Sequence, residues 1–303
     1  MTRLVEVPVQ FDDRSFDQFA AAYEAAATDG ARMLFDAHAA EWASPFGLVG
    51  LLAAGQAARQ GGEKGEKPLL TAPTNSDVAR YWARAGFFRA AADLFEVHGK
   101  VPKTSPATES EVLLPVTAVR AAADVHEVVS NIQQRASAIL ATELGLDPKA
   151  TMGFAMALSE ACQNIVEHAG TGGWVAVQSY HWRRRLGRQV VVIAVADAGV
   201  GFRHSLEPTQ GKRFGDRWGD AAALEAAVIQ GVSRFRDPGR GQGLAGIRRY
   251  LARWDGKISI RSGTARIAIV PKWDDDVPLK EGLPGFPGSQ VLIIIPEQGP
   301  AQP

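Results

Sequence analysis

The sequence predicts two α/β domains joined by a linker. Its 303 residues exceed the roughly 100–200 residues of a typical single domain. Residues 99–110 contain two prolines and several small polar side chains without apolar periodicity, as linkers do. Strand-like and helix-like patterns occur on both sides of this segment. We therefore expect domains at residues 1–98 and 111–303, with residues 99–110 between them.

Strand and helix patterns alternate through the N-terminal domain. Asn75 is a favourable N-cap for the last helix, and Pro45 suits the first turn of the helix that follows Ser44. The segment after Gly47 is helical and apolar on most faces. We expect strands at residues 5–9, 33–35, 69–72 and 95–97, and helices at residues 16–27, 48–59 and 76–84. This order is typical of a small α/β sandwich.

Helical patterns precede most strands of the second domain. Residues 190–196 are a continuous apolar run, which suits a central strand, while residues 174–180 alternate as an ordinary strand does. Residues 211–243 are polar and rich in glycine and arginine, so we expect a long loop there. The other expected strands are 258–260, 267–270 and 290–295, and the expected helices are 117–144, 150–169 and 244–254.

Composition excludes several classes of protein. Thirty-three basic residues balance thirty-three acidic ones, so no overall charge favours nucleic acid or a membrane surface as partner. Cys162 is the single cysteine, which excludes an internal disulfide and a cysteine-rich zinc site. The first residues lack an apolar signal core, and no apolar run reaches the roughly 18 residues of a spanning helix. We expect a soluble, cytoplasmic protein without a membrane partner.

Glu160, Asn164 and His168 form one polar stripe on an otherwise apolar helical segment. Because a helix advances about 100° per residue, positions four apart lie only about 40° apart around its axis. Such a stripe is costly to bury unless it meets a polar partner. A carboxylate that orients water and a carboxamide that holds a hard cation suit a magnesium-bound nucleotide. His168 lies at the expected helix end, where a cation complements the dipole.

The apolar strand at residues 190–196 runs directly into Asp197-Ala-Gly199-Val-Gly201. This order places a carboxylate at the edge of the sheet, and the glycines allow the backbone to turn sharply beside it. A carboxylate in that position suits an amino group that lies flat in a pocket. The motif therefore predicts a binding site for a flat ligand that carries an amino group.

Four motifs, taken together, resemble those of the GHKL, or Bergerat-fold, ATPases, and the anti-sigma-factor serine kinases are the most similar members. The resemblance covers about residues 111–297 and implies a two-layer α/β sandwich with a mixed sheet. The motifs occur in the family's order. They are Glu160-x-x-x-Asn164-x-x-x-His168, Asp197-x-Gly199-x-Gly201, Gly239-Arg240-Gly241-Gln-Gly243-Leu244 and Gly288-Ser289.

The resemblance implies a role for each motif, with ATP and Mg2+ as cofactors. Glu160 matches the general base and Asn164 the ligand of Mg2+. Asp197 matches the residue that binds the adenine amino group, and Ser289 the residue that touches the adenine region. Residues 211–240 match a mobile lid. The remaining expected nucleotide contacts are Gly199, Gly201, Gly239, Arg240, Gly241, Gly243 and Leu244, of which residues 239–244 cradle phosphates with backbone amides.

Residues 3–98 resemble a STAS domain, the fold of anti-sigma-factor antagonists. In that family a strand runs into an Asp-Ser-Ser/Thr-Gly turn that opens a helix, and the middle serine is phosphorylated. If Gly47 matches the family glycine, Pro45 occupies the position of that serine. We therefore expect Ser44 and Pro45 to cap the helix rather than to form a phosphorylation site.

These features predict an ATP-binding regulatory protein that acts as an anti-sigma-factor-like serine kinase or as an ATPase. The expected partner is a STAS-type or sigma-factor-like regulatory protein. Two alternatives stay open. One is a nucleotide-gated protein-binding switch with little catalysis. The other is an ATP-driven dimer clamp, in which the partner is a second copy of the chain.

Two further nucleotide-binding classes are disfavoured. Gly241-x-Gly243-x-x-Gly246 spells the dinucleotide fingerprint, but no apolar strand directly precedes it. Arg261 also stands 20 residues after Gly241, where that fingerprint needs an acid. A histidine kinase is disfavoured because no dimerisation helix with a phosphoacceptor histidine is recognisable. His126 is the only histidine of the second domain before the motif helix.

Overall fold

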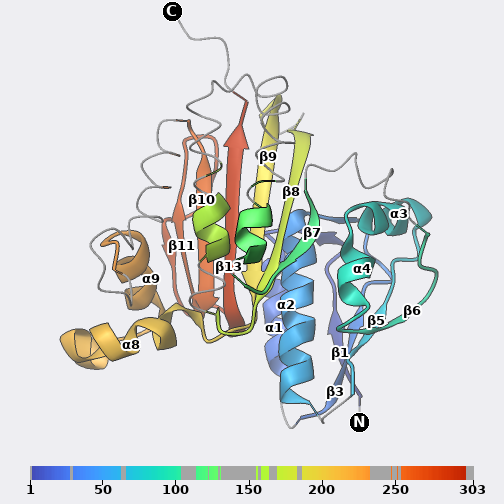
Figure 1. Ribbon diagram of the computed structural model, residues 1–303, viewed down its shortest axis with the longest axis horizontal. Helices are drawn as coiled ribbons and strands as arrows, with labels where there is room; N and C mark the ends of the chain where they lie inside the picture. Colours follow the sequence, from blue (N-terminus) through green and yellow to red (C-terminus); the bar gives the residue numbers. More distant parts are fainter. Residues whose placement is uncertain are drawn as a thin grey trace, which may run out of the picture.

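The computed structural model contains two main β-sheets, each formed by a different part of the chain (Figure 1). Strands from residues 2–98 form a four-stranded sheet, the small sheet, and strands from residues 114–296 form a seven-stranded sheet, the large sheet. The α/β class expected from the sequence is confirmed. The structure describes residues 2–27, 30–62, 66–103, 114–121, 123–128, 130, 155, 158–163, 169–182, 186–232, 247, 251 and 254–297.

The small sheet is parallel, with strand order β1-β3-β5-β6. Along it Val5, Phe35 and Leu70 are fully buried, whereas Leu4 is 53% exposed. Its strands are β1 (Thr2–Glu6), β3 (Arg32–Asp36), β5 (Leu69–Thr71) and β6 (Glu96–His98), and a short pair joins β2 (Gln10–Phe11) to β4 (Trp42–Ala43). The helices are α1 (Phe16–Ala26), α2 (Pro45–Gly61), α3 (Ser76–Arg84) and α4 (Phe87–Ala91).

The predicted order of strands and helices in this region is confirmed, with three differences. The first strand ends at Glu6 rather than at residue 9, since Pro8 cannot donate a hydrogen bond to a sheet. The short strands β2 and β4 and the helix α4 were not predicted. Asn75 caps α3, because its side chain accepts hydrogen bonds from the amides of Asp77 and Val78.

The large sheet has the order β12-β11-β10-β13-β9-β8-β7, and its neighbouring strands are all antiparallel. The mixed sheet implied by the resemblance is therefore wrong. Strands β9 and β10 do run in the same direction, but β13 lies between them and runs the opposite way. The strands are β7 (Leu114–Val119), β8 (Gly173–Trp182), β9 (Arg188–Asp197), β10 (Lys257–Gly263), β11 (Ala265–Ile269), β12 (Leu279–Lys280) and β13 (Phe286–Pro296).

Two segments of the second region fold differently from the sequence prediction. The chain forms α8 (Gly201–Phe214), a 3-10 turn (Gly215–Arg217) and α9 (Asp220–Val228), where a long loop was expected from residue 211. Pro208 lies inside α8, and its missing N–H is one reason why the pattern does not predict a helix. Residues 117–119 belong to β7, so the helix expected there begins at residue 123 among the described positions.

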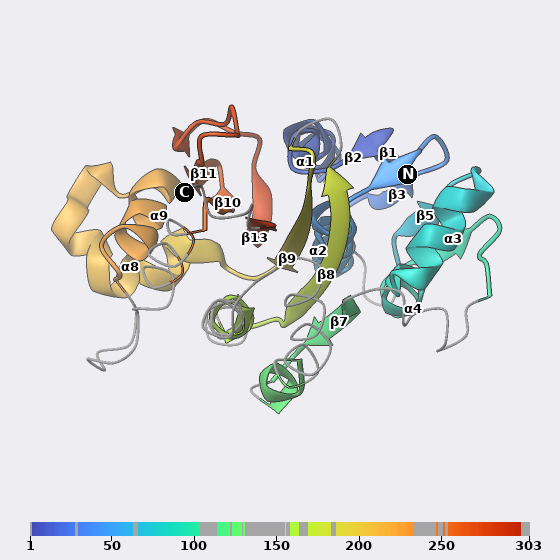
Figure 2. The ribbon, with the colours of Figure 1, turned by 90° about the horizontal axis from the view of Figure 1, so that it is seen from above.

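Helices cover both faces of the large sheet (Figure 2). Helices α8 and α9 and the helical residues 158–163 pack on one side, the front face. Helices α1 and α2 pack on the other side, the back face, and lie between the two sheets. The N-terminal region therefore shares one hydrophobic core with the large sheet. The boundary expected at residues 99–110 stays a prediction, since residues 104–113 lie outside the described part of the chain.

Helix α2 is apolar on most faces because it has a sheet on each side. All of its residues from Pro45 to Gly55 are buried. A Cβ atom on Gly50 would lie 2.4 Å from the ring of Phe16, and one on Gly55 would lie 2.1 Å from the ring of Phe95. Glycine at these positions thus lets aromatic rings of the N-terminal region touch the helix backbone.

Among the helices that the structure describes, none is both long enough and apolar enough to cross a bilayer.

Candidate functional site

Asp197 is the best-defined residue of the predicted site. It is the last residue of β9, its side chain points to the front face of the large sheet, and it is only 3% exposed. The amide of Gly199 donates a hydrogen bond of 2.8 Å to Oδ1, and the hydroxyl of Ser289 donates one to Oδ2. The structure therefore brings together Asp197 and Ser289, which lie 92 residues apart in the sequence.

The Asp197 carboxyl lacks a cationic partner among its described contacts. Burial raises its pKa from 3.8 to about 6, although hydrogen bonds from the Ser289 hydroxyl and from the amides of Gly199 and Ser289 lower it. A carboxylate has about four acceptor positions, so these three hydrogen bonds do not exhaust it. Near pH 7 this group is a buried acceptor that still has capacity for an external N–H donor.

Two glycines near Asp197 lie so close to neighbouring backbone atoms that a larger residue at either position would clash. A Cβ atom on Gly288 would lie 2.1 Å from the Asp197 carbonyl oxygen, and Gly288 also has a positive φ of 68°. A Cβ atom on Gly199 would lie 2.2 Å from the carbonyl oxygen of Ala169. Ala169, which directly follows the Glu160–His168 motif in the sequence, therefore lies against the turn of the second motif.

Ser262 is a site residue that sequence reasoning missed. It lies in β10, where its hydroxyl accepts a hydrogen bond of 3.1 Å from the amide of Phe202 and donates one of 3.0 Å to the carbonyl of Gly288. It thereby ties the turn after Asp197 to the turn before Ser289. The only sequence signal is a polar residue that faces the apolar front side at the end of a strand, which is common and unspecific.

Glu160 lies in the helical residues 158–163 and is half-buried. Leu158, Ala161 and Cys162 of the same segment are fully buried in the core of the front face. This arrangement agrees with the predicted separation of an apolar and a polar side. Cys162 is confirmed as a buried thiol, and burial raises its pKa to about 12.

The remaining predicted contacts lie outside the described residues. These are the metal ligand, the histidine of the first motif and the phosphate-binding turn: Asn164, His168, Gly239, Arg240, Gly241, Gly243 and Leu244. Of the other glycines, Gly201 begins α8 with a positive φ of 70°, and a Cβ atom there would lie 2.7 Å from Oγ of Ser262. Gly201 therefore shapes the backbone at the adenine end of the predicted site.

The predicted cap of α2 is confirmed. Ser44 is the N-cap residue, its hydroxyl accepts a hydrogen bond of 3.2 Å from the amide of Gly47, and Pro45 occupies the first turn. Ser44 is only 6% exposed. A buried hydroxyl that already caps a helix is a poor substrate for a kinase. The turn at Ser44 therefore has a structural role.

Other polar features of the described residues do not form a competing site. No group of three or more His, Cys, Asp or Glu side chains there is arranged to hold a metal ion. A cavity of about 520 Å³ lies between α9 and β11, but Asp197, Glu160 and Ser289 do not line it. The buried Asp197 carboxyl with its glycine surroundings is therefore the feature that the function must explain.

Comparison with known proteins shows a similarity for part of this region. A search of curated proteins found no match to the chain. Residues 121–254 match the family model of the histidine kinase-like ATPase domain. The match contains Glu160, Asn164, Asp197 and the glycine turn at residues 239–243, and it ends before Ser289. The part of this chain that carries these motifs is thus similar to the histidine kinase-like ATPase domain, the GHKL type of ATPase.

Proposed function

We propose that this protein is an ATP-binding regulatory protein that uses Mg-ATP as a protein serine kinase or as an ATPase. The observation that supports this most is the Asp197 carboxyl, which is buried, lacks a cationic partner among its described contacts, and is held by Gly199 and Ser289. A buried acid without a counter-charge destabilises a protein unless a ligand uses it.

The adenine end follows from the chemistry of this acid. The exocyclic amino group of adenine is a donor, and the Asp197 carboxylate is an acceptor with free capacity. Guanine carries a carbonyl oxygen at the corresponding ring position. That oxygen and the Asp197 carboxylate are both acceptors, so they cannot form a hydrogen bond with each other. A site built around one hydrogen bond rejects an analogue that cannot form it. We therefore expect the protein to prefer ATP to GTP.

The phosphate end rests on the family resemblance. Asn164 would hold Mg2+, which neutralises phosphate charge when bound, and the backbone amides of residues 239–243 would hold the phosphates. Glu160 would accept the proton of the attacking hydroxyl group, which belongs either to a protein serine or to water. General base catalysis of this kind contributes roughly 10²–10⁴-fold to a rate. Positioning of the reactants supplies most of the remainder.

The partner is proposed from the resemblance to anti-sigma-factor serine kinases. It is a regulatory protein of the STAS or sigma-factor type that offers a serine hydroxyl or a docking surface. The N-terminal region is itself a small α/β unit of four parallel strands, but its Ser44 is buried. The phosphoryl acceptor is therefore expected on another molecule rather than at the cap of α2.

The test is a comparison of ATP binding and turnover in the full chain. Purified protein is incubated with γ-labelled Mg-ATP and cell lysate, and labelled protein and free phosphate are measured. We expect Glu160→Ala to lose turnover and to retain ATP binding, because Glu160 acts on the attacking group and not on adenine. Glu225→Ala, an exposed position on α9, is the matched control and should keep both.

The possible results of this experiment distinguish a kinase, an ATPase and a nucleotide-gated switch. A labelled protein supports the kinase, and free phosphate without labelled protein supports an ATPase. ATP binding without any turnover in the wild type would contradict the catalytic part of the proposal and leave a nucleotide-gated switch. Absence of Mg-ATP binding would contradict the proposal as a whole.

A further inference from the structure

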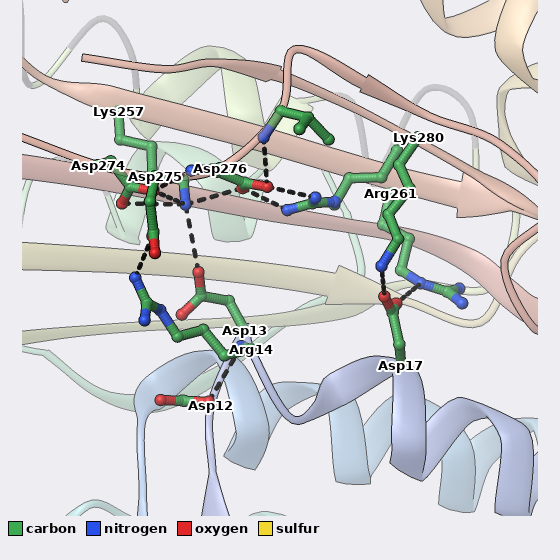
Figure 3. Close-up of polar contacts among 12 residues, drawn as sticks. Asp12, Asp13, Arg14, Asp17, Lys257, Arg261, Asp274, Asp275, Asp276 and Lys280 are labelled. Carbon is green, nitrogen blue, oxygen red and sulfur yellow. Dashed lines mark hydrogen bonds and ion pairs between the residues drawn. The ribbon is translucent and has the colours of Figure 1, made fainter. Parts of the chain in front are cut away.

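The back face of the large sheet carries an unexpected stripe of polar residues along β10. Lys257, Ser259 and Arg261 alternate with apolar residues, a pattern that normally indicates a solvated face. Here they are only 1%, 4% and 2% exposed, because the N-terminal region covers them. Burial of two cations requires specific partners. The N-terminal region supplies one to each, Asp13 in the turn before α1 for Lys257 and Asp17 in the first turn of α1 for Arg261 (Figure 3).

The first ion cluster surrounds Lys257. Its ammonium group lies 3.4 Å from Asp13 of the N-terminal region, 3.2 Å from Asp274 and 2.9 Å from Asp276. Arg266 forms a second ion pair with Asp276. Lys257 pairs with Ile294 in the register of the sheet, far along the strand from Ser289. This cluster holds the N-terminal region on the sheet at a distance from the nucleotide site.

The second cluster surrounds Arg261, next to the nucleotide site. Its guanidinium carbon lies 5.7 Å from the ring centroids of both Phe16 and Phe286, and its Nε lies 3.6 Å from Asp17. It donates hydrogen bonds to the carbonyls of Gly263 and Pro284. Arg261 thus connects α1 of the N-terminal region to the segment that leads into β13.

The same segment packs on α1 through apolar contacts. The ring of Phe286 lies 5.0 Å from that of Phe16 and 5.2 Å from that of Tyr23, centroid to centroid. A Cβ atom on Gly285 would lie 2.7 Å from a carboxyl oxygen of Glu24. The chain at residues 284–286 is therefore held by α1, whereas the residues that follow it approach Asp197.

A β-bulge lies between the part of β13 that contacts α1 and the part that contacts Asp197. Ser262 pairs with Ser289, but the next residue, Gly263, pairs with Phe286, so Pro287 and Gly288 are extra residues in β13. The bulge turns Gly288 against the backbone of Asp197 and places the Ser289 hydroxyl on its carboxylate. Only two residues separate Phe286, which contacts α1, from Ser289, which contacts the nucleotide site.

We propose that Arg261 is a positioning residue of the nucleotide site, through which the N-terminal region regulates ATP binding by holding the bulge that carries Gly288 and Ser289. The inference deepens the proposed function and rests on it for the identity of the ligand. When α1 holds Arg261 and Phe286, Ser289 is kept on the Asp197 carboxylate. A partner that displaced α1 would release the bulge and weaken the adenine end of the site.

The chain offers a matched pair of variants for the test. Asp13→Asn, in the turn before α1, and Asp17→Asn, in its first turn, make the same chemical change. Each weakens the ion pair of one buried cation of β10. Asp17 also pairs with the half-exposed Lys280 of β12 at 2.8 Å, but of the two buried cations only Arg261 contacts the bulge segment. Mg-ATP affinity is measured by calorimetry in the full chain. Couplings between sites typically change affinity 5-fold or more, so we expect Asp17→Asn to weaken ATP binding by about 5-fold and Asp13→Asn to leave it unchanged.

A second readout needs no nucleotide. The pKa of Asp197 is followed by carboxyl NMR titration, and backbone hydrogen exchange is followed over residues 284–292. Because the Ser289 hydroxyl lowers the Asp197 pKa, we expect Asp17→Asn to raise that pKa and to speed the exchange. Arg261→Met should act in the same direction and more strongly, and Arg261→Lys should recover part of the loss. A merely structural role would lower stability without moving the Asp197 pKa.

The result for Asp17→Asn decides the proposal. Wild-type values of the Asp197 pKa and of the exchange rates would overturn it, as would equal changes in Asp13→Asn, which would indicate general loosening of the interface. If the wild type failed to bind ATP, the proposed function would fail. The titration and the exchange would still show whether α1 controls the bulge.

Discussion

Two acids on opposite faces of the large sheet have pKa values that are shifted in opposite directions. On the front face, Asp197 has no cation among its described contacts, and burial raises its pKa to about 6. On the back face, burial also acts to raise the pKa of Asp276, but hydrogen bonds from Arg266 and Lys257 outweigh it and hold the pKa well below the usual range. Within the described part of the chain, only Asp276 has cations that compensate its charge.

This difference in charge compensation indicates that the two faces have different roles, attachment of the N-terminal region on the back face and ligand binding on the front face. The charged groups of the back face lie beside groups of opposite charge, and the contacts with Asp13 and Asp17 hold the N-terminal region on the sheet. Among the described residues Asp197 has no such partner, and the proposed function assigns its charge to a bound ligand. Changes on the back face should therefore lower stability without altering nucleotide binding, and changes at Asp197 should weaken binding without lowering stability. Arg261 lies between the two cases, since it contacts the back face and the bulge.

The largest expected effect is on the back face. Lys257→Met would leave Asp13, Asp274 and Asp276 without their shared cation, and loss of one partner from a buried ion pair typically costs about 3–5 kcal/mol. We expect the free energy of unfolding, measured by urea denaturation at pH 7.5, to fall by about that amount. Protein that remains folded should bind Mg-ATP with wild-type affinity. A stability within about 0.5 kcal/mol of the wild type would mean that the cluster does not hold the two regions together.

The pH dependence of stability should have opposite signs on the two faces. Because the Asp197 pKa is raised in the folded protein, its carboxylate destabilises the fold above pH 6, and this penalty disappears as the pH falls below about 4. A shift from 3.8 to about 6 corresponds to about 3 kcal/mol. Asp197→Asn should therefore raise the free energy of unfolding at pH 7.5 by up to about that amount, and the gain should be absent at pH 4.

Asp276→Asn is the matched comparison. The Asp276 pKa is lowered in the folded protein, so its carboxylate stabilises the fold above the unfolded value near pH 4 and loses this effect at lower pH. We expect Asp276→Asn to destabilise the protein at pH 7.5 and to do so less at pH 3. The comparison of the two faces fails if both variants shift stability in the same direction at pH 7.5.

A smaller effect should come from the packing of α2 on its neighbours. Gly55→Ala would place a methyl group 2.1 Å from the ring of Phe95, and overpacking of a core typically costs about 1–3 kcal/mol. Gly61→Ala, near the end of the same helix, meets nothing within 4 Å and should be neutral or stabilising. Thermal unfolding of both variants checks this. Equal melting temperatures would show that α2 is not tightly packed at Gly55.

The sequence predicted most elements of the N-terminal region because local signals were strong there. Asn75 and Pro45 marked helix starts, and short apolar runs marked strands. It did not predict that α2 lies between two sheets, although the apolar character on most of its faces was visible. Contacts such as that of Gly55 with Phe95 depend on which elements become neighbours, and periodicity does not contain that information.

The candidate site was predicted in part. Asp197 and Ser289 were named from motifs, and the structure shows their contact. Ser262 and Arg261 were not predicted to contribute to the site, because a polar residue in a strand usually indicates a solvated position. Their roles depend on the bulge at Pro287 and Gly288 and on coverage of the back face by α1, both of which are tertiary features. Helix α8 was also missed, since Pro208 and a polar composition argued against a helix.

One measurement tests the central claim most directly. Mg-ATP is titrated calorimetrically into the wild type at pH 7.5 and at pH 5, and into Asp197→Asn at pH 7.5. We predict binding to the wild type that weakens by about 10-fold at pH 5, because the carboxyl with a pKa of about 6 is then mostly protonated. Asp197→Asn should bind at least about 10-fold more weakly than the wild type, since a hydrogen bond to a charged group contributes about 1.5–3 kcal/mol. Equal affinity of the wild type and Asp197→Asn for Mg-ATP at pH 7.5 would contradict the account.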